Sequence, residues 1–306
     1  AYCRSERDKV RLRPIADVVA EIEHLIKIYG IKHFRFYDEN FTNPKPRALE
    51  LFHALAPLAI EIRAHTRSDA WDDKGDLDRA LADVNESIRQ NPKFVRAFNL
   101  RGLVQRKKGD IDRAIADYTE AIRLDPKYGI AYDNRGDAWR DKGDFDRAVA
   151  DYTEAVKLQP SNAERIKSRG YAYFYQGDFT ASAADFLRTI ELKDQIYPML
   201  FRYLARSRIG QNAGAELEAN AGRLKDKAWP YAVIELYLGR RAPEATRDAT
   251  GNQNDRCEAE FYIGEWYLTR SEPEKARSHL QAAVDTCPKG FVEYIAAVAD
   301  LKRLKP

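Results

Sequence analysis

The chain has 306 residues, of which 44% are apolar and 32% are charged, and it contains 16 glycines and 13 prolines. This composition is typical of a folded, helix-rich protein and excludes the fibrous and low-complexity classes. The residues after about 67 carry equal numbers of acidic and basic side chains, which argues against binding to nucleic acid or to a membrane surface, because both need a basic face.

Neither a membrane segment nor a secretory signal is predicted. No apolar run approaches the ~20 residues that a membrane-spanning helix needs. The first thirty residues carry charges throughout and lack the apolar stretch of a signal peptide. If the chain is expressed as given, we therefore expect it in the cytoplasm. The sequence pattern leaves its native compartment open.

Residues 1–67 differ from the rest, because they hold four of the five histidines. An apolar stripe at helical spacing predicts a helix, and Phe34 and Phe36 alternate with polar residues in a short strand that ends at Asp38. The stripe consists of Val18, Val19, Ile22, Leu25 and Ile26. This segment is therefore predicted to be a small α/β unit.

Residues 60–71 allow two interpretations. The helix expected at Leu77–Gln90 needs an apolar partner, and we expect Ile60–Trp71 to form that partner helix. The alternative is an extended segment at 60–65 that pairs with residues 32–37.

A repeat of 34 residues dominates the middle of the chain. The segment GDIDRAIADYTEAIRLDP at 109–126 returns as GDFDRAVADYTEAVKLQP at 143–160. A period of 34 is that of the tetratricopeptide repeat, in which each unit is a pair of helices, A and B. The register gives repeats at 95–128, 129–162 and 163–196, after an incomplete copy at 61–94.

The recurring residues have physical roles. Gly102 and its equivalents one and two periods later let helix A approach helix B closely. Gly109 and its equivalents end helix A, where a left-handed residue is favoured. Pro126 stops helix B.

The C-terminal part keeps the helical pattern with a weaker motif. Residues 257–290 repeat it most clearly, and residues 291–304 form an amphipathic helix that can cap the stack. We therefore expect a mainly α fold, a tetratricopeptide-repeat helical solenoid (α-α superhelix) with a small N-terminal α/β remnant. We expect three segments. Residues 1–67 form the partial α/β segment, residues 68–196 form the repeats, and residues 197–306 form degenerate repeat-like helices with a capping helix.

Three phrases in the C-terminal part resemble a narrower family. They are YAVIELYLGRRAPE at 231–244, CEAEFYIGEWYLTRSEPEKARSHLQAAVDT at 257–286 and GFVEYIAAVADL at 290–301. They are similar to NlpI-like repeat lipoproteins of the bacterial envelope. The resemblance implies an envelope adaptor that docks cell-wall hydrolases or proteases and that forms a homodimer.

The N-terminal segment resembles an unrelated family. DVVAEIEHLIKIYGIKHFRFYDENFT at 17–42 and PRALELFHALAPLAIEIRAHTRSD at 46–69 are similar to the early βα units of a radical S-adenosylmethionine enzyme of the cobalamin-associated type. The resemblance implies that Cys3 matches the last cysteine of the cluster motif and that residues 38–40 and Arg67 face the cofactor. One cysteine cannot hold an iron–sulfur cluster, so we interpret Cys3 as vestigial and the chain as a fusion, and we expect no metal and no cofactor.

The two other cysteines are predicted to lie close together. Cys257 begins helix A of its repeat and Cys287 follows helix B, and the ends of two antiparallel helices meet. A disulfide is therefore feasible. The alternative is a pair of buried free thiols.

The concave side of the solenoid is the candidate binding surface. Helix A of each repeat is expected to line it, with Arg96, Asn99, Leu100, Leu103 and Arg106 in the first repeat, Asp133, Asn134, Asp137 and Arg140 in the second, and Lys167, Tyr171, Phe174 and Tyr175 in the third. The three aromatic residues form a patch beside cations, a composition typical of peptide-binding hot spots. The alternative is that these rings pack against the next repeat.

These patterns predict a non-enzymatic scaffold that binds a peptide or a helix of a partner protein in its groove. No catalytic constellation is found in the repeat half. The alternative function is a radical S-adenosylmethionine enzyme with a repeat-containing accessory domain.

Overall fold

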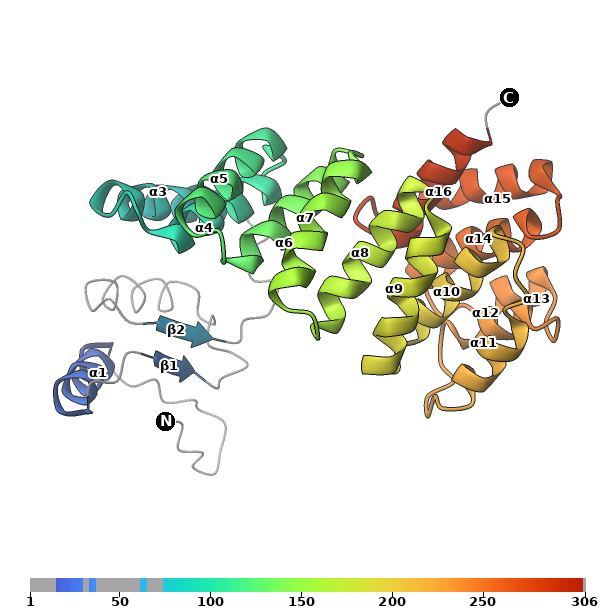
Figure 1. Ribbon diagram of the computed structural model, residues 1–306, viewed down its shortest axis with the longest axis horizontal. Coiled ribbons are helices and arrows are strands. Elements are labelled where there is room, and N and C mark those ends of the chain that lie inside the picture. The colour runs from blue at the N-terminus through green and yellow to red at the C-terminus, as the bar shows by residue number, and fades with distance from the viewer. Residues whose placement is uncertain (1–14, 30–32, 37–60, 65–73, 305–306) are drawn as a thin grey trace. The chain divides into compact units, whose positions relative to one another are not determined.

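The computed structural model describes residues 15–29, 33–36, 61–64 and 74–304 (Figure 1). Cys3, the predicted cofactor-facing residues 38–40 and Arg67 lie outside these ranges. The chain divides into two compact units, residues 1–80 and residues 81–306, and each is taken by itself. This division falls inside a helix, later in the chain than the boundary expected from the composition, so the three expected segments stay a prediction.

The N-terminal unit contains an α/β element. Helix α1 (Ile15–Tyr29) is followed by strand β1 (His33–Phe36), and β2 (Glu61–Ala64) pairs with β1 in parallel. Helix α3 (Lys74–Gln90) begins in this unit. The α/β character expected for this part of the chain is therefore present.

The helix expected at Ile60–Trp71 is wrong for residues 61–64, which form strand β2. Apolar residues at 60, 62 and 64 alternate with polar ones, and a period of two is the pattern of a strand. In addition, β1 supplies hydrogen-bonding partners for the whole strand, from His33 opposite Glu61 to Phe36 opposite Ala64. The local period and this pairing together outweigh the need of α3 for a partner helix.

The C-terminal unit is a stack of helices. Helices α4 and α5, α6 and α7, α8 and α9, and α14 and α15 form hairpins, and successive hairpins lie side by side (Figure 1). After α3 the helices are α4 (Val95–Lys107), α5 (Ile111–Leu124), α6 (Gly129–Asp141), α7 (Phe145–Leu158), α8 (Ala163–Gln176), α9 (Phe179–Leu192), α10 (Ile196–Arg208), α11 (Gly214–Ala221), α12 (Tyr231–Tyr237), α13 (Pro243–Asp248), α14 (Gln253–Leu268), α15 (Pro273–Thr286) and α16 (Val292–Arg303). The predicted fold class, a mainly α solenoid of the tetratricopeptide type, is confirmed.

Glycines make the close hairpins possible, as predicted. A Cβ atom on Gly136 of α6 would lie 2.9 Å from the ring of Tyr152 on α7, a distance that no real side chain tolerates without movement of its neighbour. Gly143 follows α6 with a φ of 76°, a left-handed conformation that glycine adopts without strain. The two helices of the hairpin therefore depend on glycine for their contact and for their turn.

A recurring ion pair joins helix A to helix B. The guanidinium of Arg135 on α6 meets both carboxylate oxygens of Asp151 on α7, at 2.8 Å and 2.7 Å. The same two-point contact recurs one period earlier and one period later, between Arg101 and Asp117 and between Arg169 and Asp185. Each aspartate is buried, and paired hydrogen bonds of this kind fix geometry as well as charge.

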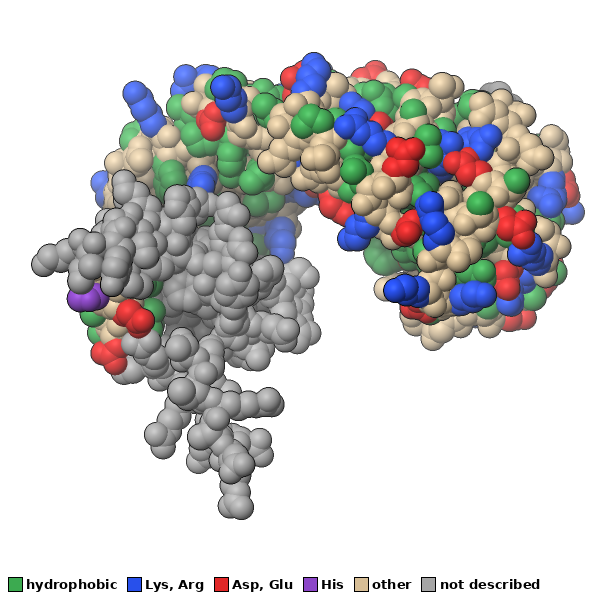
Figure 2. All heavy atoms as spheres, turned by 60° about the horizontal axis from the view of Figure 1, so that its bottom comes forward, with side chains coloured by type: hydrophobic (Ala, Val, Ile, Leu, Met, Phe, Trp, Pro, Cys, Tyr) green, Lys and Arg blue, Asp and Glu red, His purple; other side chains and the backbone are tan. Residues whose placement is uncertain are grey.

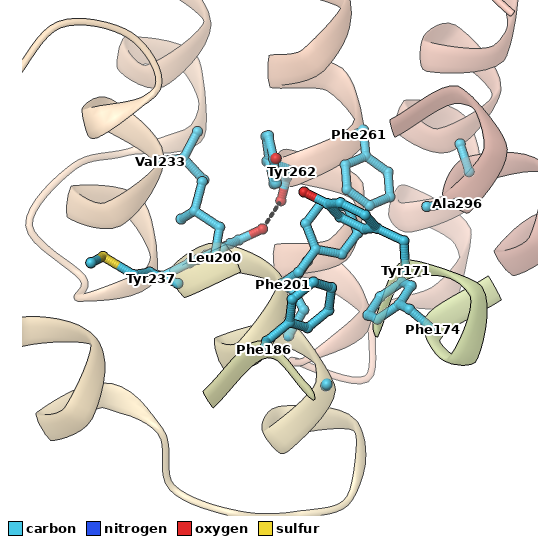
Figure 3. Close-up of a cluster of buried hydrophobic side chains, with 14 of the residues drawn as sticks. Tyr171, Phe174, Phe186, Leu200, Phe201, Val233, Tyr237, Phe261, Tyr262 and Ala296 are labelled. Atoms are coloured by element: carbon cyan, nitrogen blue, oxygen red, sulfur yellow. Dashed lines mark hydrogen bonds between the residues drawn. The ribbon is translucent and has the colours of Figure 1, made fainter. Parts of the chain in front are cut away.

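The largest core lies in the C-terminal half of the stack. Side chains from α8 to α16 pack into one cluster, and Figure 3 shows aromatic rings converging from several helices. Phe174, Phe186, Phe201 and Phe261 are completely buried there. By contrast, the clusters between α4 and α7 contain few residues each, so the earlier repeats depend on contacts with their immediate neighbours.

Replacing Gly136 by alanine is expected to lower the free energy of unfolding by roughly 1–3 kcal/mol, because the added methyl group overlaps the Tyr152 ring. Gly214→Ala is the matched control, since the nearest atom to its Cβ would lie 3.6 Å away. Urea unfolding followed by circular dichroism measures both variants. Equal midpoints for the two would contradict the proposed role of Gly136.

Candidate protein-binding surface

The A helices of neighbouring repeats contact one another, as α4 contacts α6, and this places them on the inner side of the stack. Each of these two helices carries a stripe of exposed and half-buried residues, which are spaced four, three and four positions apart. The stripe on α4 is Arg96, Leu100, Leu103 and Lys107, and the stripe on α6 is Ile130, Asn134, Asp137 and Asp141. We call these eight residues the α4–α6 surface.

Two large apolar side chains are exposed on the α4–α6 surface. Leu100 and Ile130 are each 48% exposed, although Phe98 and Ala131, close to them in sequence, are buried. Leu103 is half-buried because it packs against Tyr118 and Ala138. Isolated apolar side chains on a surface are ordinary, so the significance of this pair depends on what surrounds it.

Polar side chains join the two helices beside these residues. Asn134 Nδ2 donates a hydrogen bond of 2.8 Å to Asn99 Oδ1. Arg106 contacts Asp141 at 2.6 Å and Asp137 at 3.3 Å. Arg140 contacts Asp137 at 3.0 Å. The structure thus brings together Asn99, Arg106, Asn134, Asp137 and Arg140, five of the residues that the sequence predicted for the concave side.

The polar network ends where the sequence of one repeat changes. The hydroxyl of Tyr152 donates to Asp137 at 2.6 Å. Tyr118 occupies the equivalent position one period earlier, and its buried hydroxyl has no hydrogen-bond partner among the described residues. The reason is that Leu103 stands where the next repeat has Asp137. The α4 side of the surface is therefore more apolar than the α6 side.

Two further predicted residues make contacts with the third repeat or within it. Asp133 contacts Arg165 of α8 at 2.7 Å. Burial raises the pKa of Asp133 to about 6, and the neighbouring guanidinium opposes this shift. Lys167 contacts Gln195 at 3.3 Å and pairs with Glu164. Asp133 therefore joins α6 to α8, and Lys167 joins α8 to the residue that precedes α10.

The aromatic residues predicted for the third repeat are buried, so the expectation of an open aromatic patch is wrong. Tyr171 is 8% exposed, Tyr175 2%, and Phe174 is completely covered. The ring of Phe201 on α10 stands edge-on to Tyr171, with centroids 4.8 Å apart. Helix α16 also packs on α8, and Arg303 donates to the carbonyl oxygen of Phe174 at 3.0 Å.

The sequence contains a signal for this burial. In the second repeat the corresponding positions are Asp137, Arg140 and Asp141, and in the third repeat each becomes a ring. A helix that loses three polar residues from one face is expected to be covered by another element. The alternative stated for these rings, that they pack against the next repeat, is therefore the correct one, because Phe201 of α10 follows the third repeat directly.

A disulfide joins the two C-terminal cysteines. Cys257 near the start of α14 is bonded to Cys287 just after α15, with Cα atoms 5.1 Å apart. Both residues are buried. The bond ties together the open ends of one helical hairpin.

Metal-binding clusters and membrane-spanning helices are absent from the part of the chain that the structure describes. No group of three or more His, Cys, Asp or Glu side chains within 15–29, 33–36, 61–64 and 74–304 is arranged to hold a metal ion. Within these ranges, the helices lack the combination of length and apolar character that crossing a bilayer requires.

Residues 67–129, 100–163 and 134–198 each match the model of the tetratricopeptide repeat. The chain contains tetratricopeptide repeats. It is similar in structure to a tetratricopeptide-repeat protein from Parabacteroides merdae, at 19% identity and a TM-score of 0.51, over 78% of this chain and 95% of that one. It also matches MamA, at 21% identity and a TM-score of 0.45 over 48% of this chain and 87% of MamA. A third match is YrrB, described as a repeat protein with an unusual peptide-binding site, at 16% identity and a TM-score of 0.45 over 73% of this chain and all of YrrB.

These matches concern the fold of the repeats. At such identities a structural likeness shows the fold alone. The narrower resemblances, to NlpI-like lipoproteins and to radical S-adenosylmethionine enzymes, stay predictions from the sequence.

Phe174→Ala is expected to cost roughly 3–5 kcal/mol of stability, because it removes a completely buried ring from a packed core. Leu100→Ala is the comparison on the α4–α6 surface and should change stability by less than about 1 kcal/mol. Thermal unfolding of the two variants measures the difference. A small loss for Phe174→Ala would show that the ring is not part of a core.

Proposed function

We propose that the protein is a non-enzymatic scaffold that holds a peptide segment of a partner protein on the α4–α6 surface. The observation that carries this proposal is the exposed pair Leu100 and Ile130 on adjacent inner helices. Helical repeats create extended concave surfaces of this kind and use them for binding. A non-enzymatic role also agrees with the tetratricopeptide repeat as an interaction module.

The polar residues beside the apolar pair suit a polypeptide ligand. Asn134 is held in place by its hydrogen bond to the buried Asn99, and its amide both donates and accepts hydrogen bonds, so it can meet the N–H and C=O groups of a peptide backbone. Arg106, Arg140, Asp137 and Asp141 contact one another, and this network is neutral overall. Affinity would therefore come mainly from apolar contact, with the amide of Asn134 setting the register of the ligand.

The partner segment should carry apolar side chains followed by an acidic one. Lys107 lies exposed at one end of the α4 stripe, beyond Leu100 and Leu103, and its charge favours a negative charge at that end of the ligand. Elsewhere, basic and acidic side chains are interspersed over the face of the repeats seen in Figure 2. A strongly basic partner such as a nucleic-acid-binding tail would find no extended acidic surface on that face.

The resemblance of the C-terminal part to NlpI-like lipoproteins suggests which proteins supply the segment. It would make a cell-wall hydrolase or a protease the partner and a homodimer the working form. The alternative enzymatic function is not proposed, because the residues that would carry it, Cys3 and residues 38–40, lie outside the described ranges.

The proposal predicts which substitutions abolish binding. Peptides selected from a displayed random library on the immobilised protein would provide a probe, with affinity measured by fluorescence anisotropy. Covering the exposed halves of Leu100 and Ile130 contributes roughly 2–3 kcal/mol, so the double change Leu100→Asp, Ile130→Asp should weaken binding at least about tenfold.

Leu158→Asp is the matched control. Leu158 ends helix B of the second repeat and is 37% exposed, so its change adds a charge to an apolar surface site away from the inner helices. It should leave the affinity unchanged. Equal effects of the control and the double variant, or none from either, would contradict the proposed surface.

A further inference from the structure

Helices α14 and α16 carry four buried acidic residues that are matched in position. Glu258 and Glu265 are seven residues apart on α14, and Glu293 and Asp300 are seven residues apart on α16. Seven residues make about two turns, so each helix presents both acids on one face. All four are less than 9% exposed, and the two helices contact each other.

The first pair is Glu258 and Glu293. Glu258 accepts hydrogen bonds from the hydroxyl of Tyr197 at 3.0 Å and from the indole of Trp229 at 2.9 Å. Glu293 accepts one from Tyr262 at 2.8 Å. Burial raises the pKa of Glu293 to about 8, and the charge of Glu258 adds to this shift. The pair is thus surrounded by neutral donors.

The second pair, Glu265 and Asp300, meets at one guanidinium. Arg208 Nη2 lies 2.9 Å from Glu265 Oε1 and 2.8 Å from Asp300 Oδ1. Arg303 contacts Asp300 at 2.7 Å. The second oxygen of Asp300 is buried without a donor among the described residues. Burial raises the pKa of Glu265, with Arg208 opposing and Asp300 adding to the shift.

Other charged and titratable groups complete the surroundings of these pairs. They are Tyr171 of α8, Tyr197 and Arg208 of α10, Tyr237 of α12, Asp255 and Tyr262 of α14, and Arg303 of α16. The tyrosines are neutral below about pH 10, and Asp255 adds to the negative potential. Arg208 and Arg303 therefore place positive charge beside the second pair, whereas none of these groups places positive charge beside the first pair.

The same helix α16 covers part of the inner side of α8. Arg303 donates to the carbonyl oxygens of Phe174 and Tyr175 at the end of α8. Ala296 and Ala297 of α16 belong to the cluster that buries these rings. What holds α16 in place therefore also keeps this part of the concave surface closed.

We propose that the two carboxyl pairs form a proton-operated clasp, which holds α16 against α14 and α8 at acidic and neutral pH and releases it at alkaline pH. Its opening uncovers Tyr171, Phe174 and Tyr175, an aromatic extension of the inner surface. This consequence for partner binding rests on the proposed function, whereas the clasp itself does not.

The direction of the pH effect follows from proton linkage. A buried carboxyl whose pKa rises from 4.5 to about 8 on closure binds more protons in the closed state between these two values. The contribution of this group to the stability of the closed state is therefore complete below about pH 4.5 and is lost as the pH rises toward 8. One such group shifts the opening equilibrium up to about tenfold for each pH unit in this window.

Amide hydrogen exchange of the whole protein tests the clasp without a partner. After correction for the intrinsic rate, the opening constant of α16 should increase at least about tenfold between about pH 6 and about pH 8, while α4 to α7 keep their protection. The fluorescence of the apolar dye 8-anilinonaphthalene-1-sulfonate should increase over the same range, because the α8 rings become accessible.

Glu265→Gln with Glu293→Gln replaces, in each pair, the acid whose pKa burial raises by an uncharged amide and should flatten both profiles. Glu154→Gln is the control, an exposed acid paired with Lys157, and should leave them unchanged. Protection of α16 that does not vary with pH in the native protein would overturn the proposal, as would an undiminished profile in the double variant. Peptide binding to the α4–α6 surface, measured at about pH 6, reports separately on the proposed function.

Discussion

Phe201 lies at the meeting point of the repeat stack. Its ring centroid is 4.8 to 6.3 Å from those of five other rings, which belong to Tyr171, Phe174, Phe186, Phe261 and Tyr262. These rings come from α8, α9 and α14, so a single side chain on α10 connects helices that are far apart in the sequence (Figure 3). Offset and edge-on ring pairs contribute roughly 0.5–1.5 kcal/mol each beyond burial.

This aromatic centre divides the inner side of the stack. From α8 onward the later helices fill it with their own side chains, and α16 closes over the end of α8. At α4 and α6 no later helix of the described chain makes a comparable contact, and Leu100 and Ile130 stay exposed. A partner would therefore find its open surface at the start of the repeats, and the carboxyl pairs of α14 and α16 would control access to the remainder.

Much of the repeat architecture could be predicted from the sequence because its causes are local and periodic. Gly136 and Gly143 act within one hairpin, and the 34-residue period places a glycine at both equivalent positions of the repeats before and after it. The ion pair between Arg135 and Asp151 is equally periodic, and the same register could have identified it.

The rest depends on contacts that no local pattern specifies. Arg303 meets Phe174 across 129 positions of the chain, and contacts of α8 with α10 and α16 bury the rings of the third repeat. In the N-terminal unit, strand β2 forms because β1 lies beside it, although the repeat register predicted a helix there. At β2 the two-residue alternation of the sequence agrees with the strand, and in both places a partner distant in the sequence outweighs the expectation from the repeat register.

The division of the inner side into an open and a closed part is tested most directly by hydroxyl-radical footprinting at neutral pH, with mass spectrometry of each residue. Oxidation rates are divided by those of the unfolded chain to remove differences in intrinsic reactivity. Leu100 and Ile130 should then be oxidised much faster than Tyr171 and Phe174, which the core protects. Equal normalised rates for the two sets would contradict the account.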